Sequence, residues 1–266
     1  MDIQHNNVAG RLWALFSEAA DKPKNWAIGI VWCDLLKVPR DEKEGDASKL
    51  SIDTRLAIYD RLNAVYREVR ILEQQIRDGY DPTRASFMLK DIPRIKLAIT
   101  PHLLGNQWVE VLKHLDRATV DSLENCAIQL PKEGEIGKDD LEEFKNSVTE
   151  LMAELSRGKI KDESLSKWLF TLLSAANKAI DSYWIGGARH FREALDYTLG
   201  EILLVYRQFK DDLEKNEDAK GFWSRMTQKV LGPLGGFAQK YNVMRPLLTD
   251  TGRTVGSVLG YLEDLT

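Results

Sequence analysis

The 266-residue sequence has little of what marks several protein classes. Its two cysteines, Cys33 and Cys126, are far apart and show no CxxC spacing, which excludes a disulfide framework. No uncharged apolar run approaches the roughly 18 residues that span a bilayer. No basic segment followed by an apolar one comes after Met1, as it would in a signal peptide. We therefore expect a cytoplasmic protein with reduced thiols and no transmembrane segment.

The sequence also lacks the short motifs of common enzyme classes. There is no GxxxxGK[ST], no GxGxxG after a strand, no HExxH and no GxSxG. Glu110 and His114 have the i, i+4 spacing of half a metal site, but a closed site needs four ligands. The acidic run at 139–143 follows a glycine-containing turn, where acidic residues complement a helix dipole. We therefore predict no catalytic residues, no bound metal and no cofactor, which favours a protein that is not an enzyme.

Apolar residues recur every three to four positions along most of the chain, and sustained alternation is hard to find. This pattern predicts an all-α fold, an irregular multi-helix bundle of about ten helices. Two of them should be long, at about 50–78 and 187–215. The first shows a heptad-like apolar seam that averages 3.5 residues per step. Its members are Ile52, Leu56, Tyr59, Leu62, Tyr66, Val69, Leu72, Ile76 and Tyr80.

Arginine is frequent in the second half of that first long helix. Arg67, Arg70 and Arg77 could meet phosphates. Glu73, however, lies three residues after Arg70 and four before Arg77, a spacing at which side chains of one helix pair. We therefore expect a helix surface covered by intrahelical salt bridges.

Two segments suggest domain boundaries, the charged loop at 39–49 and the turn at 131–137. The N-terminal helical region, 1–130, would hold the heptad-like helix. The C-terminal helical region, 138–266, should open with a helical hairpin from 138–156 and 162–183 and would include a basic, glycine-rich stretch at 219–249. One continuous domain is the alternative.

The stretch 219–249 is the most unusual part of the sequence. It contains five basic residues and no acidic one, so it carries +5 in a chain of net charge −4, and the remainder totals −9. We expect two helices here, with a flexible hinge at 232–236. Such a segment could contact a partner protein, an anionic membrane or nucleic acid. The candidate contact residues are Lys220, Phe222, Trp223, Arg225, Lys229, Lys240 and Arg245.

Three glycines follow at i, i+4 and i+8, namely Gly252, Gly256 and Gly260. On a helix they would form a groove that lets a second helix approach closely. Each would cost the helix about 0.8 to 1 kcal/mol relative to alanine, so we expect a packing partner that offsets this cost.

Three hypotheses follow from these observations. The first is a non-catalytic helical subunit or regulator of a larger cytoplasmic assembly, which binds a protein partner or itself. In this reading the basic stretch packs on the acidic helices of the same molecule or on that partner. The second is an effector that acts on a membrane surface or nucleic acid through 219–249, with Phe222 and Trp223 as anchors. The third is an enzyme whose site is assembled from distant residues.

Overall fold

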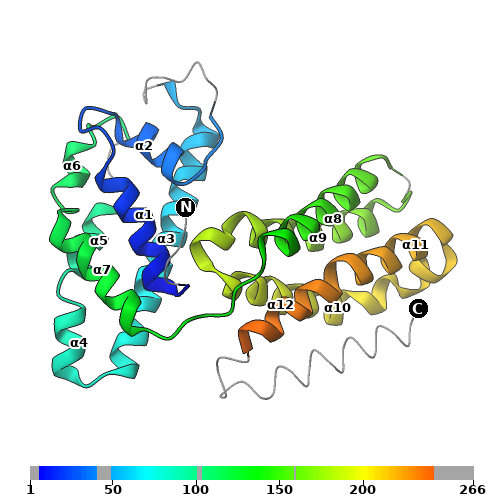
Figure 1. The fold of residues 1–266 in the computed structure, drawn as a ribbon. Helices are drawn as coiled ribbons and strands as arrows, with labels where there is room; N and C mark the ends of the chain where they lie inside the picture. Colours follow the sequence, from blue (N-terminus) through cyan, green and yellow to red (C-terminus); the bar gives the residue numbers. More distant parts are fainter. Residues whose placement is uncertain (1–5, 41–48, 101–103, 159, 243–266) are drawn as a thin grey trace. The chain divides into compact units, whose positions relative to one another are not determined.

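A computed structural model describes residues 6–40, 49–100, 104–158 and 160–242 (Figure 1). These residues form twelve α-helices and one π-helical turn, with no β-strand among them beyond a single bridge between Ala27 and Gln107. The all-α prediction is confirmed. The chain divides into an N-terminal unit, Met1–Lys132, and a C-terminal unit, Glu133–Thr266. The division lies at the start of the turn at 131–137 that the sequence suggested.

The described residues of the N-terminal unit form seven α-helices. They are α1 (Val8–Ala20), α2 (Ile28–Leu35), α3 (Ile52–Gly79), α4 (Pro82–Met88), α5 (Ile92–Ala98), α6 (Val109–Leu112) and α7 (Arg117–Gln129). Several begin at a polar side chain that caps the free backbone N–H groups of the first turn. Asn7 accepts a hydrogen bond from the Gly10 amide, and Ser51 accepts one from the Thr54 amide.

Helix α1 lies at the centre of this unit and packs against α7, α3 and α2. Nine of its thirteen residues are buried, including the charged Arg11. The Arg11 guanidinium lies 3.3 Å from the Glu68 carboxylate of α3, and both side chains are buried. The Asn7 amide donates to the carbonyls of Ala127 and Leu130 at the end of α7. The core is therefore tied together by polar contacts between residues far apart in the sequence.

The predicted long helix at 50–78 is confirmed as α3, but its predicted seam is only partly buried. Leu62, Val69, Leu72 and Ile76 are buried, whereas Ile52, Leu56 and Tyr66 are exposed. The buried stripe runs through Ile58, Leu62, Val65, Val69, Leu72 and Ile76, which average 3.6 residues per step. This is the period of a straight helix that packs on a globular core, and the heptad interpretation with 3.5 residues per step was wrong.

The C-terminal unit is a bundle of four antiparallel helical rods (Figure 1). The first three rods are α8 (Lys138–Ser156), α9 (Glu163–Gly186) and α10 (Ala188–Lys215), and the last confirms the long helix predicted at 187–215. The fourth consists of α11 (Glu217–Met226), a π-helical turn (Thr227–Leu231) and α12 (Gly232–Asn242). Each rod packs on the next, and the π-helical turn packs back on α8, which closes the bundle.

Helices α9 and α10 are joined through one residue, Gly187. Its φ of 59° and ψ of −158° form a combination that a residue with a Cβ rarely adopts. The predicted break at 186–187 therefore occurs as a tight reversal, and it allows α10 to pack along the length of α9.

The predicted hinge at 232–236 is wrong, because the fourth rod stays helical through this segment. Pro233 has no N–H to donate, and its ring crowds the carbonyl of Lys229. The helix adapts by widening for one turn, in which the Gly232 amide donates to the Thr227 carbonyl five residues earlier. A π-helical turn thus takes the place of a break.

Candidate interaction surfaces

The two aromatic residues predicted as surface anchors belong to the core of the C-terminal unit. Phe222 and Trp223 of α11 are buried. The Trp223 ring stacks on Trp168 of α9 with ring centroids 5.7 Å apart, and Trp168 also stacks on Phe209 of α10. Neither predicted anchor is on the surface. Their apolar area is used instead to join the fourth rod to α9.

Two of the predicted cations make ion pairs within the bundle. Arg225 donates a hydrogen bond to the Glu154 carboxylate, and the Lys229 Nζ lies 2.9 Å from Glu150 Oε2. Because the two helices are antiparallel, these contacts form a ladder of two rungs. The hydrogen bond and the positive charge of Lys229 lower the pKa of the Glu150 carboxyl. At these two residues the basic stretch packs on an acidic helix of the same molecule, as the first hypothesis expects.

The remaining predicted contact residues are only partly visible. Lys220 is exposed on α11 and makes no ion pair with a described residue. Lys240 lies on α12, but its side chain is outside the described part of the chain. Arg245 and the glycine series Gly252, Gly256 and Gly260 also lie outside the described residues.

In the structure, Glu110 of the candidate metal pair has a lysine as its partner. Glu110 bonds to Lys113 at 2.6 Å, and α6 ends at Leu112, before His114. Asp139 and Asp140 lie in the exposed first turn of α8, as their sequence context indicated. Among the residues that the structure describes, no group of three or more His, Cys, Asp or Glu side chains is arranged to hold a metal ion. Within the same residues, no helix combines the length and apolar character needed to cross a membrane.

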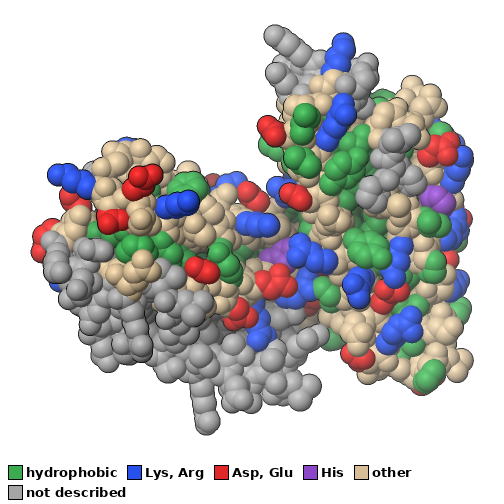
Figure 2. Space-filling model, turned by 180° about the vertical axis from the view of Figure 1, so that it is seen from behind, with side chains coloured by type: hydrophobic (Ala, Val, Ile, Leu, Met, Phe, Trp, Pro, Cys, Tyr) green, Lys and Arg blue, Asp and Glu red, His purple; other side chains and the backbone are tan. Residues whose placement is uncertain are grey.

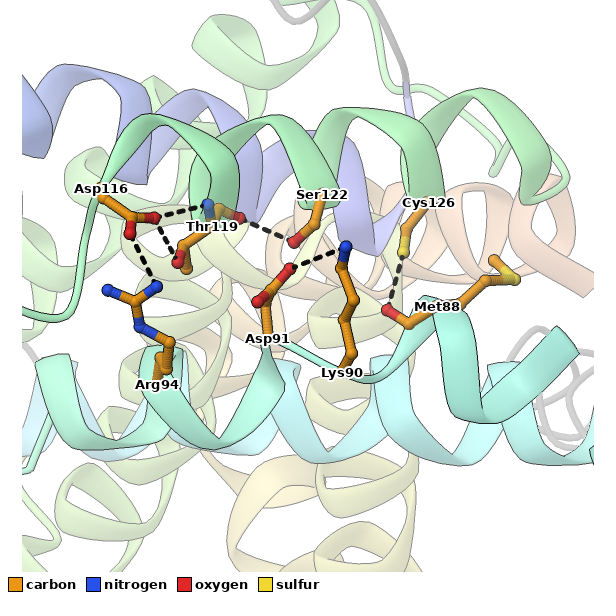
Figure 3. A network of polar contacts seen from close by, with 8 residues as sticks. All are labelled: Met88, Lys90, Asp91, Arg94, Asp116, Thr119, Ser122 and Cys126. Atoms are coloured by element: carbon orange, nitrogen blue, oxygen red, sulfur yellow. Dashed lines mark hydrogen bonds and ion pairs between the residues drawn. The ribbon is translucent and has the colours of Figure 1, made fainter. Parts of the chain in front are cut away.

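A polar network joins α5 to α7 in the N-terminal unit (Figure 3). Asp116 caps α7 by accepting hydrogen bonds from the Thr119 amide and hydroxyl, and Arg94 of α5 donates to its other oxygen at 2.7 Å. These hydrogen bonds, with that from the Thr119 amide contributing most, lower the pKa of Asp116 to about 2. A proton acceptor held this strongly in its charged form is a structural cap rather than a general base at neutral pH.

The thiol at the other end of this network is also structural. Cys126 donates to the Met88 carbonyl at 3.6 Å, and burial raises its pKa to about 11, with a smaller contribution from the negative charge of Asp91. A thiol with so high a pKa forms little nucleophilic thiolate at neutral pH. The network thus joins helices without providing a nucleophile.

A surface that the sequence interpretation missed lies along the outside of α3. We call it the α3 outer stripe. It faces away from the buried stripe of the same helix. Figure 2 shows how hydrophobic and charged side chains are mixed on one face of the molecule. The stripe comprises Ile52, Asp53, Leu56, Asp60, Asn63, Tyr66, Arg67 and Arg70, all of them exposed.

Large apolar side chains occupy part of this stripe. Ile52 is 76% exposed, Leu56 57% and Tyr66 39%. Ile52 and Leu56 are one turn apart, so they form a continuous apolar surface on the first turns of the helix. Tyr66 still contacts α5, because the Lys96 Nζ lies over its ring at 6.0 Å from the centroid. Ile52 and Leu56 are separate from the apolar row that the helix buries in the core of the unit.

The charged residues of the stripe are not paired as the sequence suggested. Glu73 turns to Lys96 of α5, with 2.6 Å between the charged atoms, instead of to Arg70 or Arg77. Asp60, Arg67 and Arg70 make no ion pair with a described residue. The predicted intrahelical pairing was wrong because Glu73 binds a cation of a neighbouring helix instead. The spacing of residues within α3 does not reveal this cation.

One signal in the sequence could have identified the stripe. Leu56, Asn63 and Arg70 are separated by two helical turns each, and Asp60 and Arg67 by the same interval. A row with this spacing that mixes leucine, tyrosine and both charges differs from an ordinary solvated helix face.

The chain matches no known protein family, no curated protein and no solved structure.

Proposed function

We propose that the chain is a non-catalytic helical subunit or regulator of a larger cytoplasmic assembly, and that it binds a protein partner through the α3 outer stripe. The observation that carries this proposal is the second apolar row of α3, in which Ile52 and Leu56 are exposed on the same face as charges that make no ion pair with a described residue.

The composition of the stripe supports a protein partner. Tyrosine and arginine are enriched at protein interfaces relative to the rest of the surface. The stripe contains Tyr66, Arg67 and Arg70, together with two aliphatic residues. It carries both signs of charge, which a surface for nucleic acid or anionic lipid would not require.

Site-specific photo-cross-linking tests this proposal. A photoreactive phenylalanine analogue placed at Leu56 in the full chain, in cells of the source organism, should form an adduct with a discrete protein. Phe170 of α9 is the matched control, because it is also a large apolar residue on a helix and is 43% exposed. The proposal fails if Leu56 yields no protein adduct, or only the adducts that Phe170 also yields.

A further inference from the structure

The charges of the α3 outer stripe suggest one specific partner. Asp60 and Arg67 are two turns apart on the same side of α3, both exposed and both without an ion pair among the described residues. At about 1.5 Å per residue their Cα atoms are roughly 10 Å apart along the helix axis, too far for a direct pair. The helix therefore presents a negative and a positive group at a fixed separation.

The two charges on one α3 are complementary to those on a second α3 that runs in the opposite direction. If a second α3 lies antiparallel across the stripe, with the twofold axis between Asn63 and Ala64, Asp60 of each copy faces Arg67 of the other. In the same register the aliphatic stem of Arg70 lies along Leu56 of the other copy, which covers the exposed apolar surface. A parallel pair would instead set Asp60 against Asp60 and Arg67 against Arg67.

Antiparallel helices that are joined by two ion pairs already occur inside the molecule. In the C-terminal unit, Arg225 and Lys229 on one helix meet Glu154 and Glu150 on an antiparallel helix. The N-terminal unit holds the groups for a comparable ladder on α3, but the described part of the chain supplies no helix to face them.

From this complementarity we propose that the α3 outer stripe binds a second copy of this chain as an antiparallel, twofold-symmetric helix pair. The proposal rests on the proposed function, since it names the partner of that same surface. One helix face is narrower than the roughly 800 Å² per partner that a standard complex buries. The dimer should therefore be weak and form reversibly as concentration increases into the micromolar range.

Charge reversal tests the register, with sedimentation velocity on the full chain as the measurement. Asp60→Arg creates two arginine–arginine contacts in the dimer, and Arg67→Glu creates two contacts between carboxylates. Each variant alone should raise the dissociation constant by about tenfold or more. An equimolar mixture of the two variants should associate again, because both contacts are then between opposite charges. The double variant D60R/R67E should recover for the same reason.

Controls separate this result from unfolding and from a general charge effect. Far-UV circular dichroism should show the same helical content in all variants. Arg117→Glu reverses an exposed charge on α7, where Arg117 pairs with Asp121 of its own helix, and should leave association unchanged. A wild-type chain that stays monomeric to high micromolar concentration overturns the proposal. A mixture of D60R and R67E that fails to associate overturns it as well.

The two proposals fail in different ways. If the photoreactive group at Leu56 attaches to a different protein and the wild-type chain stays monomeric, the second copy is wrong and the proposed function stands. If that group attaches to no protein, the proposed function fails whatever the sedimentation shows at high concentration.

Discussion

The two units of the chain treat their charged side chains differently. The N-terminal unit has 19 acidic and 19 basic residues, and the C-terminal unit has 22 acidic and 18 basic, so the second accounts for the entire net charge of −4. In the C-terminal unit, Arg225 and Lys229 face carboxylates across the bundle. In the N-terminal unit, Asp60 and Arg67 of α3 face solvent. The unit with balanced charge thus presents, on its long helix α3, charges that make no ion pair with a described residue.

The units also differ in how their cores are joined. In the C-terminal unit consecutive rods pack against each other, and their contacts are dominated by apolar and aromatic side chains. In the N-terminal unit, buried polar groups such as Asn7 and Arg11 join α1 to α7 and α3 in addition to the apolar contacts. Buried polar contacts are costly to break, because a partner left behind remains desolvated. The N-terminal unit should therefore be more sensitive to single polar substitutions.

The largest effect should come from Arg11→Ala. It removes the cation from a buried ion pair with Glu68, and breaking such a pair typically costs about 3–5 kcal/mol. Hydrogen exchange measured by mass spectrometry should show this loss in the N-terminal unit, while peptides of the C-terminal unit keep their protection. Equal loss in both units would show that they unfold together and would remove the basis of the comparison.

The next effect should be in the C-terminal unit, from Gly187→Ala. A Cβ at a φ of 59° and ψ of −158° is strained, and we expect a loss of about 1–3 kcal/mol in the unfolding free energy. Gly200→Ala is the control, because Gly200 lies inside α10 with open space around its Cβ position. That change should stabilise the helix by about 0.5–1 kcal/mol. Urea denaturation should show a lower unfolding free energy for Gly187→Ala and a higher one for Gly200→Ala. A lower unfolding free energy for both variants contradicts this interpretation.

Much of the architecture was predictable because it depends on local signals. Gly187 marks the reversal between α9 and α10, and regular apolar spacing marks both long helices. The continuity of the fourth rod was not predictable from composition. Gly232 and Pro233 are typical of a break, but the fourth rod packs on α8 and α10 and continues through a π-helical turn.

The candidate surfaces were harder to predict for the same reason. The sequence pattern around Phe222 and Trp223 is the same whether these residues contact a membrane or another helix. Tertiary packing decides between the two. The α3 outer stripe was missed because an average spacing of 3.5 residues merged exposed Leu56 with buried Leu62 into one seam. The pairing of Glu73 with Lys96 depends on where α5 lies, which spacing within α3 does not contain.

A smaller effect is expected at the polar network of the N-terminal unit. Asp116→Ala removes the cap of α7 and should lower the unfolding free energy by about 1 kcal/mol at neutral pH. The pKa of Asp116 is about 2 in the folded chain and ordinarily 3.8, so its contribution is present above pH 4 and is lost as the pH falls toward 2. The difference between wild type and variant, measured by urea denaturation, should shrink over that interval. A difference independent of pH would exclude the charged cap.

The smallest effect tests whether the ladder of the C-terminal unit is closed in solution. Lys229→Met removes the ammonium group but keeps much of the side-chain length, so the pKa of Glu150 should rise toward its ordinary value. Arg225→Met should raise it less, because Lys229 supplies both the hydrogen bond and the larger charge effect, whereas Arg225 acts on Glu150 only through its more distant charge. NMR titration of the Glu150 side chain measures both shifts. If neither variant moves this pKa, the ladder is open in solution, and the C-terminal unit has unpaired cations on its surface as the N-terminal unit does.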